Sequence, residues 1–271
     1  MLLLGHLHHA WRLCADAAKY PAMFTIPSVQ KPAAQALLQD GLSLLAPTQL
    51  LDTLALPSSE WRAKWPTLAD AWNRLPPDLH LRDGGHYRNR RHACFTQDLI
   101  AQTLQPVAHR AHWQPVDYNA LHGGFERWFE PIEPSVVNDP LWIGLLTALG
   151  ELFAKVKPVK QWFIEAHQFR IDTAGGVGRP TPEGAHRDGV DFVVVLLVGR
   201  SGVKGGETRV FDAHGQHGVR FVMEQPLTAL LLDDERVIHE TTPILPADSA
   251  VGGFRDTLVL TYRSAGFQSP T

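Results

Sequence analysis

The chain has 271 residues and a net charge of −3, and its composition is 44% hydrophobic and 20% charged. This balance is typical of a soluble globular protein and excludes the disordered and collagen-like classes. Because neither sign of charge gathers in one half of the chain, the sequence also argues against a nucleic-acid-binding protein.

Cysteines and apolar segments bear on where the protein works. Cys14 and Cys94 are too few for a disulfide framework and form no C-x-x-C motif, which favours a reducing compartment. The apolar segment 1–4 is broken by His6 before it reaches the length of a signal peptide, and no window approaches the roughly 18 apolar residues of a membrane span. We therefore expect a cytoplasmic protein that does not enter a membrane.

The first part of the chain has the pattern of helices separated by prolines and glycines. We predict helices over residues 31–39, 48–54 and 58–75, the last one interrupted at Pro66. Proline near a helix start and glycine after a helix end support these limits. A loop at 83–85 follows, and the strand signals from there to about residue 118 are weak.

A stronger helix should begin at Pro140. Asp139 can cap it, and proline suits the first helical position. The leucines that follow form one apolar stripe along the predicted helix, namely Leu141, Leu145, Leu149 and Leu152. This helix should end before Pro158.

From residue 161 the sequence changes to short runs of Val, Phe, Thr and Ile between Gly, Pro and Asp turns, which is typical of antiparallel strands. We predict strands over residues 162–171, 191–198, 207–211, 219–223, 227–232, 237–241 and 257–263. Such short, closely spaced strands favour a two-sheet jelly roll. The expected fold is therefore α+β, with a jelly-roll core over residues 161–271, a mainly helical layer over residues 1–160 packed against it, and one domain in all.

Three side chains near these strands suggest a metal site. His186 and Asp188 stand two residues apart at the entrance of a predicted strand, so alternation directs both to one face. His239 lies in an apolar run, where a histidine needs a partner. Two imidazoles and a carboxylate form the facial triad of non-haem Fe(II) sites, which leaves coordination positions open; Zn²⁺ is the alternative ion because it binds such ligands more tightly.

An anion clamp is predicted shortly after His239. Alternation places Arg255, Thr257 and Arg263 on one face of a strand. A guanidinium binds a carboxylate through two parallel hydrogen bonds and keeps its charge, and a threonine hydroxyl adds a further donor. We expect Arg255 and Thr257 to hold a carboxylate, with Arg263 as the alternative clamp.

Five motifs in a fixed order carry a family resemblance. They are HQFR at 167–170, PEGAHRDG at 182–189, GGE at 205–207, DDERVIH at 233–239 and RDTLV at 255–259, with a weaker one, DGGHYRNRR, at 83–91. Together they resemble the Fe(II)/2-oxoglutarate-dependent dioxygenases, and within them the bacterial branch similar to isoleucine dioxygenase-type free-amino-acid hydroxylases.

The resemblance implies an oxidative activity. Fe(II) would be bound by His186, Asp188 and His239, 2-oxoglutarate would chelate it with its far carboxylate on Arg255, and O₂ would take the last position. Products would be succinate, CO₂ and a hydroxylated small molecule, a free L-amino acid in the first instance. Halogenating relatives carry a small residue at the position of Asp188, so this carboxylate favours hydroxylation. The alternatives are a protein side-chain hydroxylase, a thioether sulfoxidase, or a non-catalytic jelly-roll binding protein.

Other polar residues have either a pocket or a purely structural interpretation. Gln168 and Arg170 are expected to line the pocket and receive a substrate carboxylate, although Arg170 could equally brace a loop, and Glu207 is expected to shape the pocket floor. A basic cluster could anchor an acidic substrate group or lie in solvent, namely Arg82, Arg88, Arg90 and Arg91. We expect surface positions for His6, His8, His9, His109, His112, His214 and His217, and a flexible loop that could cover the site at 175–178.

Overall fold

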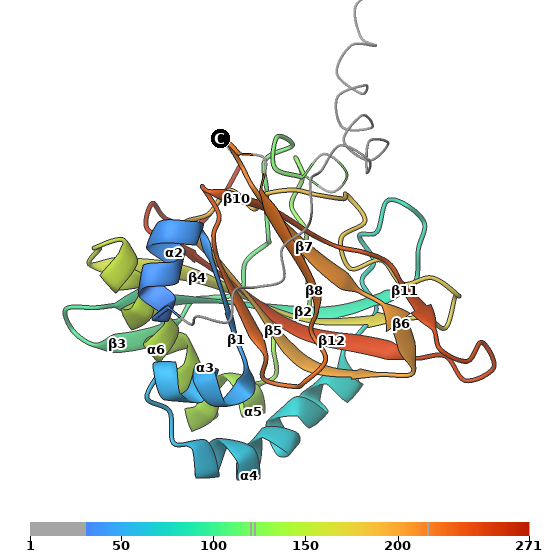
Figure 1. Ribbon diagram of the computed structural model, residues 1–271, viewed down its shortest axis with the longest axis horizontal. Helices are drawn as coiled ribbons and strands as arrows, with labels where there is room; N and C mark the ends of the chain where they lie inside the picture. Colours follow the sequence, from blue (N-terminus) through green and yellow to red (C-terminus); the bar gives the residue numbers. More distant parts are fainter. Residues whose placement is uncertain (1–30, 120, 122, 216, 271) are drawn as a thin grey trace, which may run out of the picture.

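The computed structural model describes residues 31–119, 121, 123–215 and 217–270, where helices gather on one side of a large antiparallel sheet (Figure 1). His6, His8, His9 and Cys14 fall outside these ranges. Within them, no helix is both long enough and apolar enough to cross a membrane.

Four of the helices lie close to their predicted positions, and one short helix, over residues 134–137, was not predicted. The helices are α2 (Ala33–Asp40), α3 (Pro47–Thr53), α4 (Ser58–Ala69), the short α5 (Pro134–Val137) and α6 (Pro140–Val156). As predicted, the carboxylate of Asp139 caps α6 by accepting the N–H of Leu141 at 2.8 Å. Pro66 does not interrupt its helix: α4 continues past it to Ala69 and then tightens into the 3₁₀ helix η1 (Asp70–Arg74).

Antiparallel pairing joins the strands into three sheets. The seven-stranded sheet has the order β1 (Leu42–Leu45), β9 (Ala229–Asp233), β5 (Phe192–Ser201), β12 (Phe254–Arg263), β4 (Gln161–Asp172), β2 (Arg88–Asp98) and β3 (Thr103–Pro106). The three-stranded sheet has the order β10 (Val237–Thr241), β7 (Glu207–Asp212) and β8 (Gly218–Val222), and β11 (Ile244–Pro246) pairs with β6 (Val203–Gly205).

The strands are not confined to residues 161–271, which corrects the sequence-based layering. β1, β2 and β3 come from the first 160 residues and take both edges of the main sheet. The longest of them, β2, escaped prediction because its inward positions carry Arg88, Arg90 and His92 instead of apolar residues. An apolar alternation is the main sequence signal of a half-buried strand, and β2 lacks it.

The two faces of the main sheet serve different purposes. On the helix side, Trp162 of β4 and Tyr262 of β12 pack with α6 in the main hydrophobic core. Their polar atoms are satisfied there, since Trp162 Nε1 donates to the carbonyl of Gly150 at 2.9 Å and the Tyr262 hydroxyl to that of Leu146 at 2.8 Å. The other face of β4 and β12 is left to line a pocket.

Candidate active site

A small cavity of about 130 Å³ lies against that second face of the main sheet. Its walls come from β2, β4 and β12, from β10 of the smaller sheet, and from the loops around residues 112–127 and 180–190. Because side chains alternate along a strand, every second residue of β4 and β12 points into it. On β12 these are Arg255, Thr257, Val259, Thr261 and Arg263, the set that alternation predicts.

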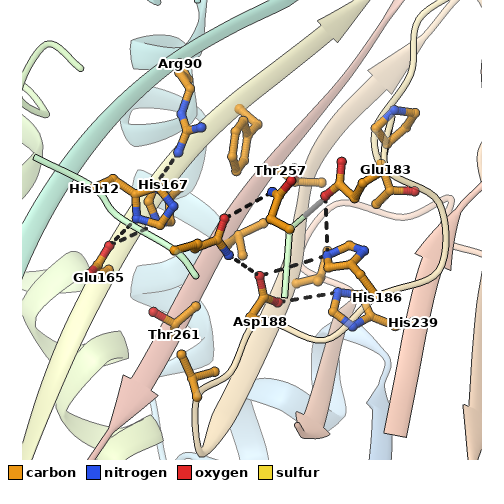
Figure 2. A pocket seen from close by; sticks show the side chains of 18 of the residues that line it. Arg90, His112, Glu165, His167, Glu183, His186, Asp188, His239, Thr257 and Thr261 are labelled. Carbon is orange, nitrogen blue, oxygen red and sulfur yellow. Dashed lines mark hydrogen bonds and ion pairs between the residues drawn. The ribbon is translucent and has the colours of Figure 1, made fainter. Parts of the chain in front are cut away.

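The structure brings His186, Asp188 and His239 together at one end of this cavity (Figure 2). The backbones of His186 and His239 exchange two hydrogen bonds of 3.0 Å, which fixes a loop residue beside a strand residue. Asp188 lies beside the two rings (Figure 2), with Oδ1 4.0 Å from His186 Nε2 and Oδ2 3.7 Å from His239 Nε2. The three ligand atoms are close enough together to hold one metal ion.

Hydrogen bonds from neighbouring residues orient His186 and the loop that carries Asp188. His186 Nδ1 lies 2.9 Å from the carbonyl of Gly184, so the ring donates there and keeps the Nε2 lone pair for the cavity. The loop that carries Asp188 is anchored by Asp234, which is fully buried and was not predicted. Its carboxylate accepts the backbone N–H groups of residues 188, 189 and 190 at 3.0, 2.7 and 3.1 Å.

Electrostatics separate the two histidines. Burial, and then the charge of His186, lower the pKa of His239 to about 3. Burial also acts to lower the pKa of His186, but the carboxylates of Glu183 and Asp188 outweigh it and raise that pKa. Glu183, whose Oε1 lies 3.5 Å from His186 Nε2, is a further residue that sequence reasoning missed. His239 is therefore neutral at physiological pH, the form in which imidazole binds metals.

Arg255 is placed as an anion clamp should be. It is only 3% exposed, and its Nε and Nη2 have no hydrogen-bond partner within the described part of the chain. Burial, and then the nearby charge of Arg200, lower its pKa to about 10. Arg263, the alternative clamp, instead donates to the carbonyl of Gly266 at 2.8 Å. The structure therefore favours Arg255, with Thr257 beside it on the same face.

Three predicted substrate residues are not placed at the cavity. Gln168 and Arg170 occupy the opposite face of β4, where Gln168 is fully buried and Arg170 pairs with Asp256 at 2.6 Å. Glu207 starts β7 as predicted, but its carboxylate accepts from Arg209 at 2.8 Å. The sequence held a signal for the first two: they continue the stripe that begins Trp162, Ile164, Ala166, which packs against the helices.

A second polar cluster lies at the other end of the cavity (Figure 2). Glu165 Oε2 lies 2.6 Å from His112 Nδ1, 3.1 Å from His92 Nε2 and 3.7 Å from His167 Nε2. The predicted surface position of His112 is therefore wrong, because it is buried against this carboxylate. His214 and His217 are exposed as predicted.

This second cluster is built for hydrogen bonding and not for a metal. Arg90 Nη2 lies 2.7 Å from His167 Nδ1. Since a guanidinium can only donate, Nδ1 must accept, and the proton of His167 sits on Nε2, which removes it as a ligand. The separation of 2.6 Å between Glu165 and His112 is also a hydrogen-bond distance, shorter than the roughly 3 Å between neighbouring ligands of an ion with bonds of about 2.1 Å.

The residues that line the cavity fall largely within the part of the chain that matches a known family model. A family model described as 2OG-Fe dioxygenase matches residues 69–261, which includes both polar clusters and Arg255. The chain belongs to the 2OG-Fe dioxygenase family. It is therefore a dioxygenase, and its chemistry uses Fe(II), 2-oxoglutarate and O₂.

Solved structures similar to this dioxygenase share its fold. A bsmA homolog from Methylobium petroleophilum PM1 is 56% identical, with 92% of this chain and 100% of that chain covered and a TM-score of 0.85. IDO from Bacillus thuringiensis is 18% identical, covers 89% and 99%, and has a TM-score of 0.71. The Fe(II)/α-ketoglutarate-dependent dioxygenase TqaL is 18% identical, covers 85% and 84%, and has a TM-score of 0.61. No curated protein matches the chain.

The residues of this dioxygenase fit the groups that its family uses. Two imidazoles and one carboxylate are the donor set of non-haem Fe(II), and their ligand atoms lie within 4.8 Å of one another. The unpartnered N–H groups of Arg255 are the kind of donor that the far carboxylate of 2-oxoglutarate requires. Both lie on the same cavity.

Proposed function

We propose that this dioxygenase hydroxylates a free L-amino acid, and that its sheets form the double-stranded β-helix expected of such enzymes. His186, Asp188 and His239 would hold Fe(II), and Arg255 with Thr257 would hold 2-oxoglutarate. The observation that carries the proposal is the convergence of the three ligand atoms at one end of a cavity that also contains a buried, unpartnered guanidinium.

When bound, Fe(II), 2-oxoglutarate and O₂ supply the oxidative decarboxylation that gives succinate and CO₂ and places one oxygen atom in a substrate C–H bond. The chain positions and shields these groups. Gly184 and Asp234 hold the ligands in place through the hydrogen bonds described above. Apolar side chains line the cavity around them, including Val190, Val195 and Val259, and keep water away from the reacting atoms.

Two observations support a small-molecule substrate. The cavity has a volume of only about 130 Å³ and is lined by strands and loops. The ordered motifs resemble those of free-amino-acid hydroxylases of the isoleucine dioxygenase type. Asp188 supports hydroxylation over halogenation, because the carboxylate occupies the position that a halide would need.

A mass-spectrometric screen tests this function. The protein is incubated with Fe(II), 2-oxoglutarate, O₂ and the free L-amino acids, and each amino acid is examined for the gain of one oxygen while succinate is measured. We expect one product formed with matching succinate, and no product from Asp188→Ala. Asp52→Ala, which removes an exposed helical carboxylate, is the matched control. Turnover with peptides alone, or no succinate under any condition, would contradict the proposal.

A further inference from the structure

Three buried arginines line the end of the cavity that is remote from the metal ligands. Arg88 and Arg90 come from β2 and Arg127 from the segment that pairs with His112, and they are 6%, 3% and 2% exposed. Arg88 Nε binds the buried Asp78 at 2.7 Å, and Arg90 Nη1 lies 3.8 Å from the same carboxylate. Within the described residues, Arg88 Nη2, Arg90 Nε and Arg127 Nε have no hydrogen-bond partner.

The carboxylates near these cations are already engaged, and Glu183, which also acts on Arg127, lies 3.5 Å from His186 Nε2. Asp78 serves two guanidinium groups, and Glu165 is engaged by the histidines of the second cluster. Burial, followed by the charge of Arg88, lowers the pKa of Arg127 to about 10. Buried guanidinium groups with unpartnered N–H donors are costly, so an anion that enters here and accepts from them would be stabilised.

Arg90 is held rigidly for such a contact. Its guanidinium lies between two rings, 3.7 Å from the centroid of Phe129 and 4.4 Å from that of Phe169. A fixed guanidinium loses little conformational entropy when it binds a ligand. Its neighbour Arg127 is fixed by Gln114, whose Oε1 accepts from Nη2 at 2.9 Å.

One acceptor accompanies these donors. Burial, more than any other influence, lowers the pKa of His112 to about 4, so its ring is neutral. The Nδ1–H donates to Glu165, and Nε2 therefore carries a lone pair. His112 lines the cavity together with Arg90 and Arg127, so the same end offers two cationic donors and one neutral acceptor.

This end is separate from the clamp for 2-oxoglutarate. In the main sheet, β4 lies between β2, which carries Arg90, and β12, which carries Arg255. Two strand spacings separate these two backbones by roughly 10 Å. The Arg90 guanidinium is held near β2 and β4 by the rings of Phe129 and Phe169, which sets it apart from Arg255. The remote end is nevertheless linked to the metal end, because Gln114 Nε2 donates to Asp188 Oδ1 at 3.1 Å while its oxygen accepts from Arg127.

We propose that Arg90 and Arg127 form a carboxylate subsite for the substrate, and that His112 Nε2 accepts a hydrogen bond from an N–H group adjacent to that carboxylate. The proposal rests on the proposed function and assigns the head group of an α-amino acid to residues at a fixed distance from Asp188. The substrate side chain would then extend toward the metal ligands, past the apolar Val190 and Val259.

Equilibrium dialysis without O₂ tests the subsite, because binding is then measured without turnover. The protein, loaded with Fe(II) and 2-oxoglutarate, is dialysed against L-valine, L-leucine, L-isoleucine, L-methionine and L-phenylalanine, and retention is measured by mass spectrometry. The same series without the carboxylate, as amines, and without the amine, as acids, is run in parallel. Retained 2-oxoglutarate is measured in each sample.

We expect the protein to retain at least one amino acid and not to retain the corresponding amine, which lacks the carboxylate. Arg90→Gln and Arg127→Gln should each weaken retention by about tenfold or more. Arg91→Gln is the control, since Arg91 of the same strand turns away to pair with Glu130 at 3.0 Å. His112→Phe should weaken binding of the amino acid but not of its acid, a difference that a purely structural role would not produce.

The outcomes separate the subsite from the proposed function. If 2-oxoglutarate is retained but no amino acid is, the head-group assignment is overturned and the oxidative site stands. If the amino acid binds both arginine variants as it binds the wild type, the subsite lies elsewhere. Loss of 2-oxoglutarate from the wild type would instead count against the proposed function. Arg90→Lys and Arg127→Lys, which keep the charge without the fork, give the same comparison if the glutamine variants unfold.

Discussion

Replacement of Arg255 by glutamine should specifically impair the binding of 2-oxoglutarate. The guanidinium is 3% exposed and has two N–H groups without a partner in the described residues, so both are available to one carboxylate. A hydrogen bond to a charged group contributes about 1.5–3 kcal/mol, and solvent does not screen a buried one. Loss of the pair should cost about 3 kcal/mol or more, which raises the 2-oxoglutarate concentration at half-saturation by more than roughly 100-fold.

The assay is a titration of 2-oxoglutarate into the Fe(II)-loaded protein in the absence of O₂, with iron content measured separately. Iron binding should be unchanged, because Arg255 does not belong to the ligand group. Arg263→Gln is the matched control: Arg263 lines the same cavity but already donates to Gly266. An unaltered titration for Arg255→Gln, or the loss appearing in Arg263→Gln instead, would refute the assignment.

Three further predictions concern the metal ligands and the buried polar network. Asp188→Ala should abolish both stoichiometric Fe(II) binding and succinate formation, measured by metal analysis and mass spectrometry; full activity would remove Asp188 from the site. Asp234→Asn should lower the free energy of unfolding by about 1–3 kcal/mol, because an amide NH₂ faces backbone donors that a carboxylate accepts; urea denaturation with no change would contradict this. The pKa of His112 lies near 4 in the fold and 6.5 outside it, so acidification protonates the unfolded chain first. The stabilisation from neutral His112 should be fully present above pH 6.5, and the free energy of unfolding should fall by up to about 3 kcal/mol toward pH 4. A further loss is expected below pH 4.5, where Glu165 binds protons in the unfolded chain first. In the fold, burial acts to raise the pKa of Glu165, but His112 and His92 outweigh it and lower that pKa. Urea denaturation across this range should show a flatter pH dependence in His112→Asn.

Local patterns carried much of the prediction. The cap and apolar stripe of α6 needed only neighbouring residues, and so did the placement of Arg255, Thr257 and Arg263 on one face of β12. The proximity of His186 to Asp188 likewise follows from their spacing of two. Alternation does not tell which face of β4 meets the cavity. Gln168 was predicted on the cavity face, but it lies buried on the opposite face.

The pocket's remote end depends on segments that are far apart in the chain. Arg90, His112, Arg127 and Glu165 come from two strands and a long loop, and no spacing rule connects them. Their burial also runs against the rule that charged residues lie in solvent, so β2 looked like an exposed basic run.

The sequence by itself indicated the oxidative chemistry, because its ordered motifs resemble those of a dioxygenase family and strand periodicity places neighbouring candidate residues on one face. Only the tertiary structure decided which side chains line the other end of the cavity. The pairing of β2 with β4 and the return of the loop at 112–127 enclose a set of charges that are stable in the interior only through contacts made across the whole fold.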